Sequence, residues 1–150
     1  MAATTDTTDT TDAMTTERTR ATVQEFLARV AAGDLERLGA LFAERVDWLI
    51  AENPDVPWIR PRSTRADAVA HFRELAEGVA PALDGNTVDA VVVEGTEAMV
   101  TGVLAGTVRA TGKRYRSPFA MRVTVEDGLI TRYRVYEDSL MFAAACTPDA

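Results

Sequence analysis

The chain has 150 residues, 47% of them hydrophobic, which suits one domain with its own core. The net charge is −7 and the isoelectric point about 4.7. This acidic balance argues against nucleic acid and against an anionic membrane surface, since both bind basic patches. No apolar run approaches the roughly 20 residues of a membrane span, and the polar N-terminal residues do not resemble a signal peptide.

Cysteine and histidine are scarce. Cys146 is the single cysteine and His71 the single histidine, so neither an intrachain disulfide nor a Cys/His metal cluster can form. We therefore expect no metal and no cofactor, and we expect the reducing setting of the cytoplasm. Cys146 is interpreted as an idle thiol.

The N-terminal part predicts a polar tail followed by helices. Residues 1–15 are a Thr/Asp repeat without an apolar face, which predicts a disordered tail and leaves residues 16–150 as a single domain. Residues 16–32 have the apolar spacing of an amphipathic helix. Gly33 ends this helix, and Asp34 can cap a short second one.

A strand, a loop and a third helix come next. Residues 46–50 read Val-Asp-Trp-Leu-Ile and predict a strand. Three prolines in residues 51–62 exclude a helix or a central strand, so a loop is expected there. Thr64 and Asp67 form a capping box for the third helix, whose buried face should include Phe72.

The second half of the chain changes to the pattern of β-strands. Strands rich in Val, Thr and aromatic residues are expected at 87–94, 98–109, 114–125 and 129–136. The last three should form an antiparallel meander, and Gly102 and Gly106 predict sharp curvature or a bulge. Three helices packed on one face of such a strongly curved, mostly antiparallel sheet make a cone-shaped α+β barrel. Its apolar interior is a natural small-molecule pocket.

Three segments within residues 18–142 resemble the SnoaL-like members of the nuclear transport factor 2-like superfamily. They are residues 41–48, residues 57–72, and the segment Asp-Gly-Leu-Ile-Thr-Arg-Tyr-Arg-Val-Tyr-Glu-Asp at 127–138. The superfamily includes ketosteroid isomerases, polyketide cyclases, limonene-type epoxide hydrolases and non-enzymatic binding proteins. The resemblance therefore implies the cone fold and a homodimer formed through the outer face of the sheet, but the fold alone does not select one activity.

The resemblance assigns one catalytic candidate, Asp138. It falls where the cyclases and epoxide hydrolases carry an aspartate at the pocket mouth, and a carboxylate there suits proton transfer. The alternative is that Asp138 caps the chain exit through backbone amides. The partners of the relatives' aspartate are replaced, with Met121 where the cyclases have histidine, and Gly102 and Leu104 where the epoxide hydrolases have Arg-x-Asp.

Further residues are candidates for binding the substrate. Glu52 follows the first strand near the position of the ketosteroid isomerase base, although a solvated loop is the simpler interpretation. His71 lies one step off the apolar stripe of its helix and is interpreted as a flanking residue. The predicted substrate-binding set, some of which could instead be core, is Trp48, Glu52, Trp58, Phe72, Met121 and Tyr136.

Strand periodicity raises a question about Arg132 and Arg134. In a regular strand they share a face with Asp138, so either the arginines enter the pocket or a bulge intervenes. The energetic penalty of burying charge favours the bulge, or an outer position for both arginines. Tyr115, Tyr133 and Tyr136 are possible hydrogen-bond donors, with no indication of which point inward.

These observations predict a cofactor-independent cyclase or isomerase of bacterial secondary metabolism. Its substrate would be an apolar, polyketide-type intermediate, with Asp138 as general acid or base. A non-catalytic binding or accessory protein of the same fold is the alternative. Epoxide hydrolysis with Asp138 and Glu52 is a weaker one.

Overall fold

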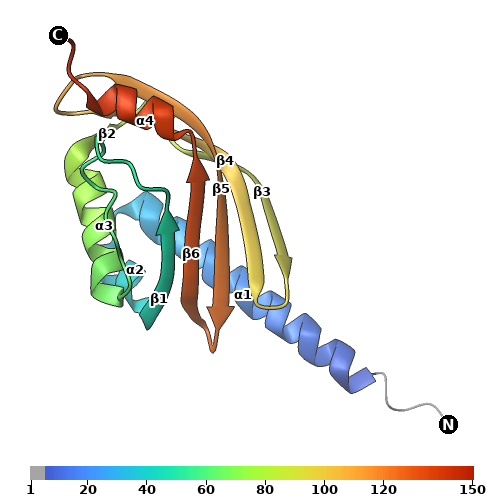
Figure 1. Cartoon of the computed structure of the whole chain (residues 1–150). Coiled ribbons are helices and arrows are strands. Elements are labelled where there is room, and N and C mark those ends of the chain that lie inside the picture. The colour runs from blue at the N-terminus through green and yellow to red at the C-terminus, as the bar shows by residue number, and fades with distance from the viewer. Residues whose placement is uncertain (1–5) are drawn as a thin grey trace.

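The computed structural model describes residues 6–150, which form helices and one sheet arranged as an open cone (Figure 1). The helices are α1 (Asp6–Ala32), α2 (Leu35–Ala40), α3 (Arg65–Gly78) and α4 (Ser139–Cys146). The strands are β1 (Phe42–Ile50), β2 (Val79–Pro81), β3 (Thr87–Glu94), β4 (Glu97–Val108), β5 (Arg114–Glu126) and β6 (Leu129–Glu137).

Helix α1 begins earlier than the sequence predicts. Residues 6–15, expected to be disordered, are helical, and residues 7–14 are exposed because the helix extends beyond the sheet (Figure 1). Thr11 and Thr15 donate their hydroxyl hydrogens to backbone carbonyls one turn earlier, at 2.8 and 3.0 Å, so these two side chains form hydrogen bonds within the helix itself. The rest of the expected tail, residues 1–5, lies outside the described residues.

The sheet is mixed, with strand order β1-β6-β5-β4-β2, and β3 also pairs with β4. β1 runs parallel to β6, and the other pairs are antiparallel. The expected meander of the last three strands is therefore confirmed. The sequence did not predict the short β2, which continues directly from α3, or helix α4.

Two glycines of β4 allow the sheet to curl. A Cβ on Gly102 would lie 1.9 Å from the carbonyl oxygen of Thr87, so only glycine allows β3 to approach. The β3–β4 register shifts at this point, between Val88 and Ala90. At Gly106 a Cβ would lie 2.6 Å from the side chain of Val79 in β2. The predicted bulge is thus found in the β3–β4 pair. Further along, β4 changes its pairing partner from β3 to β2.

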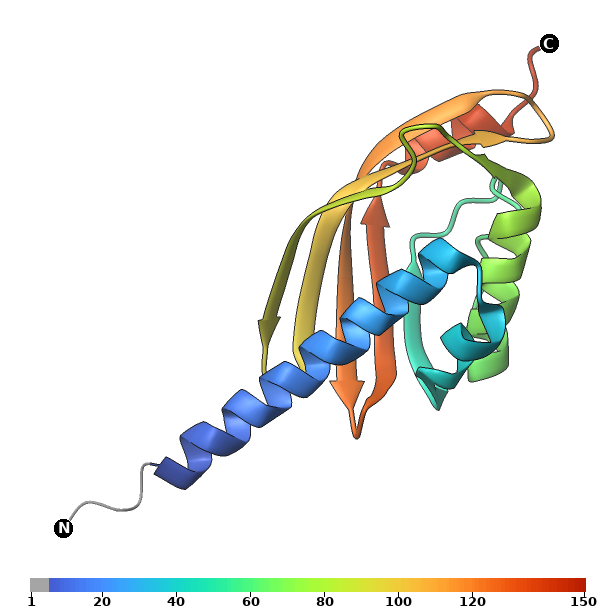
Figure 2. The ribbon, with the colours of Figure 1, turned by 180° about the vertical axis from the view of Figure 1, so that it is seen from behind.

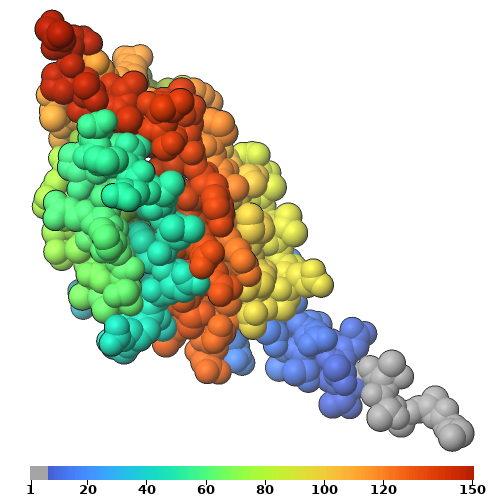
Figure 3. Space-filling model, viewed as in Figure 1, coloured from blue at the N-terminus to red at the C-terminus, as the bar shows by residue number. Residues whose placement is uncertain are grey.

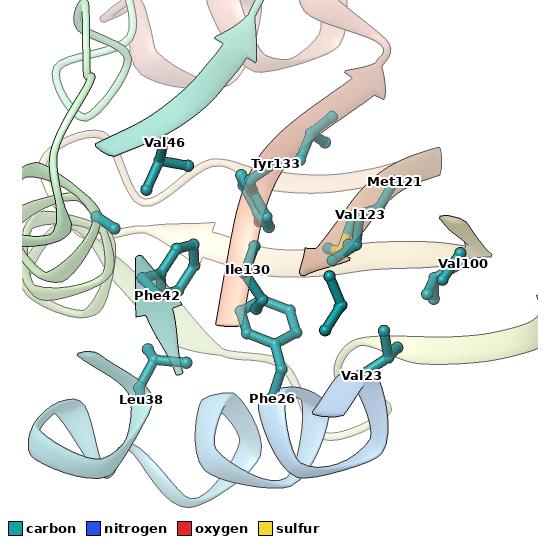
Figure 4. Packing of buried hydrophobic residues seen from close by; sticks show 14 of the residues in the cluster. Val23, Phe26, Leu38, Phe42, Val46, Val100, Met121, Val123, Ile130 and Tyr133 are labelled. Carbon is teal, nitrogen blue, oxygen red and sulfur yellow. The ribbon is translucent and has the colours of Figure 1, made fainter. Parts of the chain in front are cut away.

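The core fills the space between the helices and the concave face of the sheet. In the rear view of Figure 2, helix α1 crosses this concave face. Phe26 of α1 packs edge-to-face on Phe42, Phe72 and Tyr133, with ring centroids 5.7–6.0 Å apart. Figure 4 shows Phe26, Phe42 and Tyr133 converging from a helix and two strands. The helices and the curled sheet form the predicted α+β cone. No helix among residues 6–150 is long and apolar enough to cross a membrane.

Candidate active site

A mostly apolar cavity of about 220 Å³ lies inside the cone. Its walls come from α1, α3, the strands β3 to β6, and α4. The polar side chains that reach it belong to His71, Asn86, Thr87, Tyr115, Tyr133 and Glu137. A second cavity of about 250 Å³ adjoins it between α1, α2, α3 and β2, and Val30, Phe72, Leu75, Asn86 and Tyr115 line both.

The strand β6 decides which side chains enter this cavity. Its register against β5 shifts between Ile130 and Arg132, so a bulge separates these two residues. Ile130 is buried, and beyond the bulge Tyr133, Val135 and Glu137 face the cavity. Arg132 and Arg134 point to the outer face, as Asp138 does, and no bulge lies between them and Asp138. The parity question is therefore answered by an outer position for both arginines.

The outer arginines share one carboxylate. Arg132 Nε lies 2.9 Å from Asp47 Oδ2, and Arg134 Nη2 lies 3.0 and 2.9 Å from the two Asp47 oxygens. These hydrogen bonds, that of Arg132 foremost, hold the pKa of Asp47 below its ordinary value. Both guanidinium groups are therefore paired outside the cavity, and neither is available to bind an anionic ligand inside it.

The side chain of Asp138 lies outside the cavity. It is exposed and accepts a hydrogen bond from the Met141 backbone N–H at 3.1 Å, which makes it the N-cap of α4. Its own N–H donates to Ser117 Oγ at 2.9 Å. The structure thus corrects the expected placement of Asp138 at the pocket, and the capping alternative describes what it does.

Glu137, the preceding residue, carries the carboxyl group of the cavity. Alternation along β6 turns it to the side opposite Asp138. Across residues 6–150 no hydrogen bond or ion pair to its side chain is found, and burial alone raises its pKa to about 7. A carboxyl group titrating near neutrality can both take up and release a proton under physiological conditions.

Two phenols face the same cavity. Burial, the largest cause, raises the pKa of Tyr115 to about 12 and that of Tyr133 further still. The charge of Glu137 adds to both shifts, so the carboxyl group lies within electrostatic reach of each phenol. Both hydroxyls therefore stay protonated and can donate hydrogen bonds to a developing oxyanion.

His71 lies in the wall of the cavity rather than on a solvent-facing flank. It is only 4% exposed, and its ring nitrogen Nδ1 lies 3.1 Å from the Trp58 carbonyl oxygen. Burial lowers its pKa to about 4, so the ring is neutral near pH 7. The interpretation of His71 as a flanking residue was therefore wrong in position.

The other predicted binding residues divide into two groups. Trp58, Phe72 and Met121 line the cavity. Trp48 packs in the core with its ring centroid 4.4 Å from that of Tyr133, while Glu52 and Tyr136 are exposed and outside the cavity. Among the replaced partner positions, Met121 and Leu104 form apolar wall.

The family of the chain is shown by comparison with known proteins. Residues 23–133 match the model of the SnoaL-like domain, and the chain belongs to this family. None of the curated proteins matches the sequence significantly.

Solved structures share the fold. A nuclear transport factor 2-like protein from Burkholderia xenovorans is 25% identical with a TM-score of 0.77, covering 88% of this chain and 98% of its own. A proposed ketosteroid isomerase from Kribbella flavida is 25% identical, with a TM-score of 0.59. The match covers 82% of this chain and 79% of the isomerase. An epoxide hydrolase from Mycobacterium tuberculosis is 16% identical, with a TM-score of 0.65. The match covers 87% of this chain and 90% of the hydrolase, and it shows a likeness of fold alone.

Proposed function

We propose that this protein is a cofactor-independent isomerase or cyclase that moves a proton on an apolar, polyketide-type small molecule. The observation that carries the proposal is Glu137, a carboxyl group in a mostly apolar cavity without a hydrogen-bond or ion-pair partner among residues 6–150, with its pKa raised to about 7. The family and its isomerase relatives agree with this chemistry. The catalytic role expected of Asp138 thereby passes to its neighbour.

The reaction would begin at a carbon next to a carbonyl group. The Glu137 carboxylate removes a proton from that carbon, and the electron pair of the C–H bond moves to the carbonyl oxygen to form an enolate. Tyr115 and Tyr133 supply O–H donors for the enolate oxygen. In an isomerisation, Glu137 returns the proton to another carbon of the enolate. In a cyclisation, the enolate carbon bonds to a second carbonyl carbon, whose oxygen takes up the proton.

A non-catalytic binding protein is the second candidate. It is favoured by the apolar residues Met121 and Leu104, which stand where catalytic partners of the relatives are expected. Epoxide hydrolysis loses its support, because the side chains of both proposed residues, Asp138 and Glu52, are exposed outside the cavity.

Exchange of carbon-bound hydrogen distinguishes these candidates. The probe is 2-tetralone, an apolar ketone with acidic α-hydrogens, followed by proton NMR in deuterated water. Wild type should accelerate the exchange saturably, and Glu137→Gln should lower the enzymatic rate by roughly 100- to 10,000-fold. Asp138→Asn is the matched control and should leave the rate unchanged.

The other outcomes are equally informative. Equal exchange by wild type and Glu137→Gln would refute the role of Glu137. Binding of 2-tetralone without any accelerated exchange would favour the non-catalytic binding protein.

Two further expectations remain proposals. We propose a homodimer formed through the outer face of the sheet, where β1, β6, β5 and β4 lie side by side with no helix across them (Figure 3). A cytoplasmic location accords with the single free thiol, Cys146.

A further inference from the structure

The tautomer of His71 follows from one contact. Its Nδ1 lies 3.1 Å from the carbonyl oxygen of Trp58. A carbonyl oxygen can only accept a hydrogen bond, so the hydrogen of the neutral ring is on Nδ1. The other nitrogen, Nε2, therefore has no hydrogen and presents a lone pair.

This lone pair has no donor within the part of the chain that the structure describes. The ring is 96% buried and forms part of the cavity wall. Trp48 and Phe72 contact the ring edge-to-face, with centroid distances of 4.9 and 5.1 Å, and restrict its movement. A rigid acceptor without a partner at a buried cavity wall is a polar group that a ligand can satisfy.

We propose that His71 Nε2 is a fixed hydrogen-bond acceptor for the ligand, and that the cavity selects apolar molecules bearing a neutral hydroxyl or N–H group. This inference rests on the cavity being the ligand site of the proposed function, and it narrows the substrate class to phenols, enols and similar donors. Arg62 is ion-paired with Glu74, and the two charges act on His71 with opposite signs, so together they give no strong preference for a charged ligand group at this place.

The cavity should discriminate between ligands that donate a hydrogen bond to Nε2 and ligands that cover Nε2 without donating one. A ligand hydroxyl donates to Nε2, whereas a methyl ether of the same ring system brings an apolar group against the lone pair and excludes water from it. The second ligand leaves a buried acceptor unsatisfied, which weakens its binding.

Two probes of nearly equal shape test this directly. The donor probe is 2-naphthol and its matched control is 2-methoxynaphthalene. We expect 2-naphthol to bind roughly tenfold more tightly to wild type. Because His71 is the only histidine, the imidazole nitrogen-15 spectrum is unambiguous. It should show one protonated and one unprotonated nitrogen, and 2-naphthol should move the unprotonated resonance upfield.

His71→Phe should remove the preference for 2-naphthol, while Glu137→Gln should keep it. The wild-type spectrum keeps the test decisive if His71→Phe fails to fold. Binding of 2-naphthol without a shift of the Nε2 resonance, or a hydrogen found on Nε2, would overturn the proposal. Loss of ketone exchange with the naphthol shift intact would remove the proposed reaction and leave the acceptor role standing. Failure of both probes to bind would overturn the ligand site itself.

Discussion

Replacing Glu137 by glutamine should stabilise the protein at alkaline pH and have little effect in mild acid. In the folded state, burial raises the pKa of this carboxyl group from 4.5 to about 7. The folded state therefore binds more protons than the unfolded state between these two values, and its stability falls as the pH rises through this window. Glutamine has nearly the same shape and does not ionise, so it removes this destabilisation.

The magnitude follows from the size of the pKa shift. Each pKa unit corresponds to about 1.4 kcal/mol, and the rise from 4.5 to about 7 thus corresponds to about 3 kcal/mol once Glu137 is ionised in both states. At pH 5 only about 1 kcal/mol of this destabilisation is present. Between pH 5 and pH 8, the advantage of Glu137→Gln over wild type should therefore grow by roughly 2–3 kcal/mol.

Urea unfolding at both pH values measures this difference, and thermal unfolding should show a gain of roughly 5–10 °C at pH 8. Glu52→Gln replaces an exposed carboxylate outside the cavity and is the matched control. His71 contributes with the opposite sign, because its pKa is lowered from 6.5 to about 4 and stability is lost as the pH falls through that window. This contribution is common to wild type and variant, so it cancels in their difference.

A constant stability difference between Glu137→Gln and wild type from pH 5 to pH 8 would refute the reasoning. It would mean that water or another group solvates the carboxylate as well in the folded as in the unfolded chain. If the carboxylate stays hydrated in the folded protein, burial does not raise its pKa, and the physical basis for Glu137 as a base that titrates near neutrality is lost.

Four other predictions follow from single features of the structure. The rate of ketone exchange should rise with pH to a plateau with a midpoint near 7, read from kcat/KM profiles, because the base form of Glu137 is required. Asp138→Ala should lower the unfolding free energy by about 1 kcal/mol in urea titrations through loss of the α4 cap, without loss of exchange activity. Gly102→Ala should lower it by about 1–3 kcal/mol or more, since the added Cβ meets the Thr87 carbonyl oxygen. Met99→Glu on the outer face should convert the proposed dimer to a monomer in sedimentation velocity.

Local patterns predicted most of the fold. The capping box of Thr64 and Asp67 is present at the start of α3, and the meander follows the expected alternation. Helix α4 was missed because its eight residues are almost wholly apolar and show no amphipathic spacing. Yet its signal was in the chain, since Asp138 precedes a run of helix-forming residues as an N-cap does.

The site was harder to predict than the fold, although the bulge of β6 lies between Ile130 and Arg132 and the strand alternates regularly beyond it. Counting every second residue back from Asp138 places it with Arg132 and Arg134, which are indeed all outside. The same count from Tyr133 leads through a buried valine to Glu137, a carboxyl group on an inward-facing row. That periodicity was readable in the sequence, but family position drew attention to the neighbouring aspartate instead.

The titratable groups of the cavity share one electrostatic property. Tyr115 and Tyr133 stay protonated and His71 stays neutral near pH 7, so Glu137 is the only one of the four that changes charge there. The cavity wall is uncharged below this pH, which suits an apolar ligand that carries a hydroxyl and a carbonyl group. When Glu137 ionises, no positively charged residue of the cavity wall balances its charge. Proton transfer moves the negative charge to a substrate oxygen, to which the phenols of Tyr115 and Tyr133 can donate hydrogen bonds. The same burial that destabilises the folded protein at alkaline pH therefore favours the proton transfer that we propose.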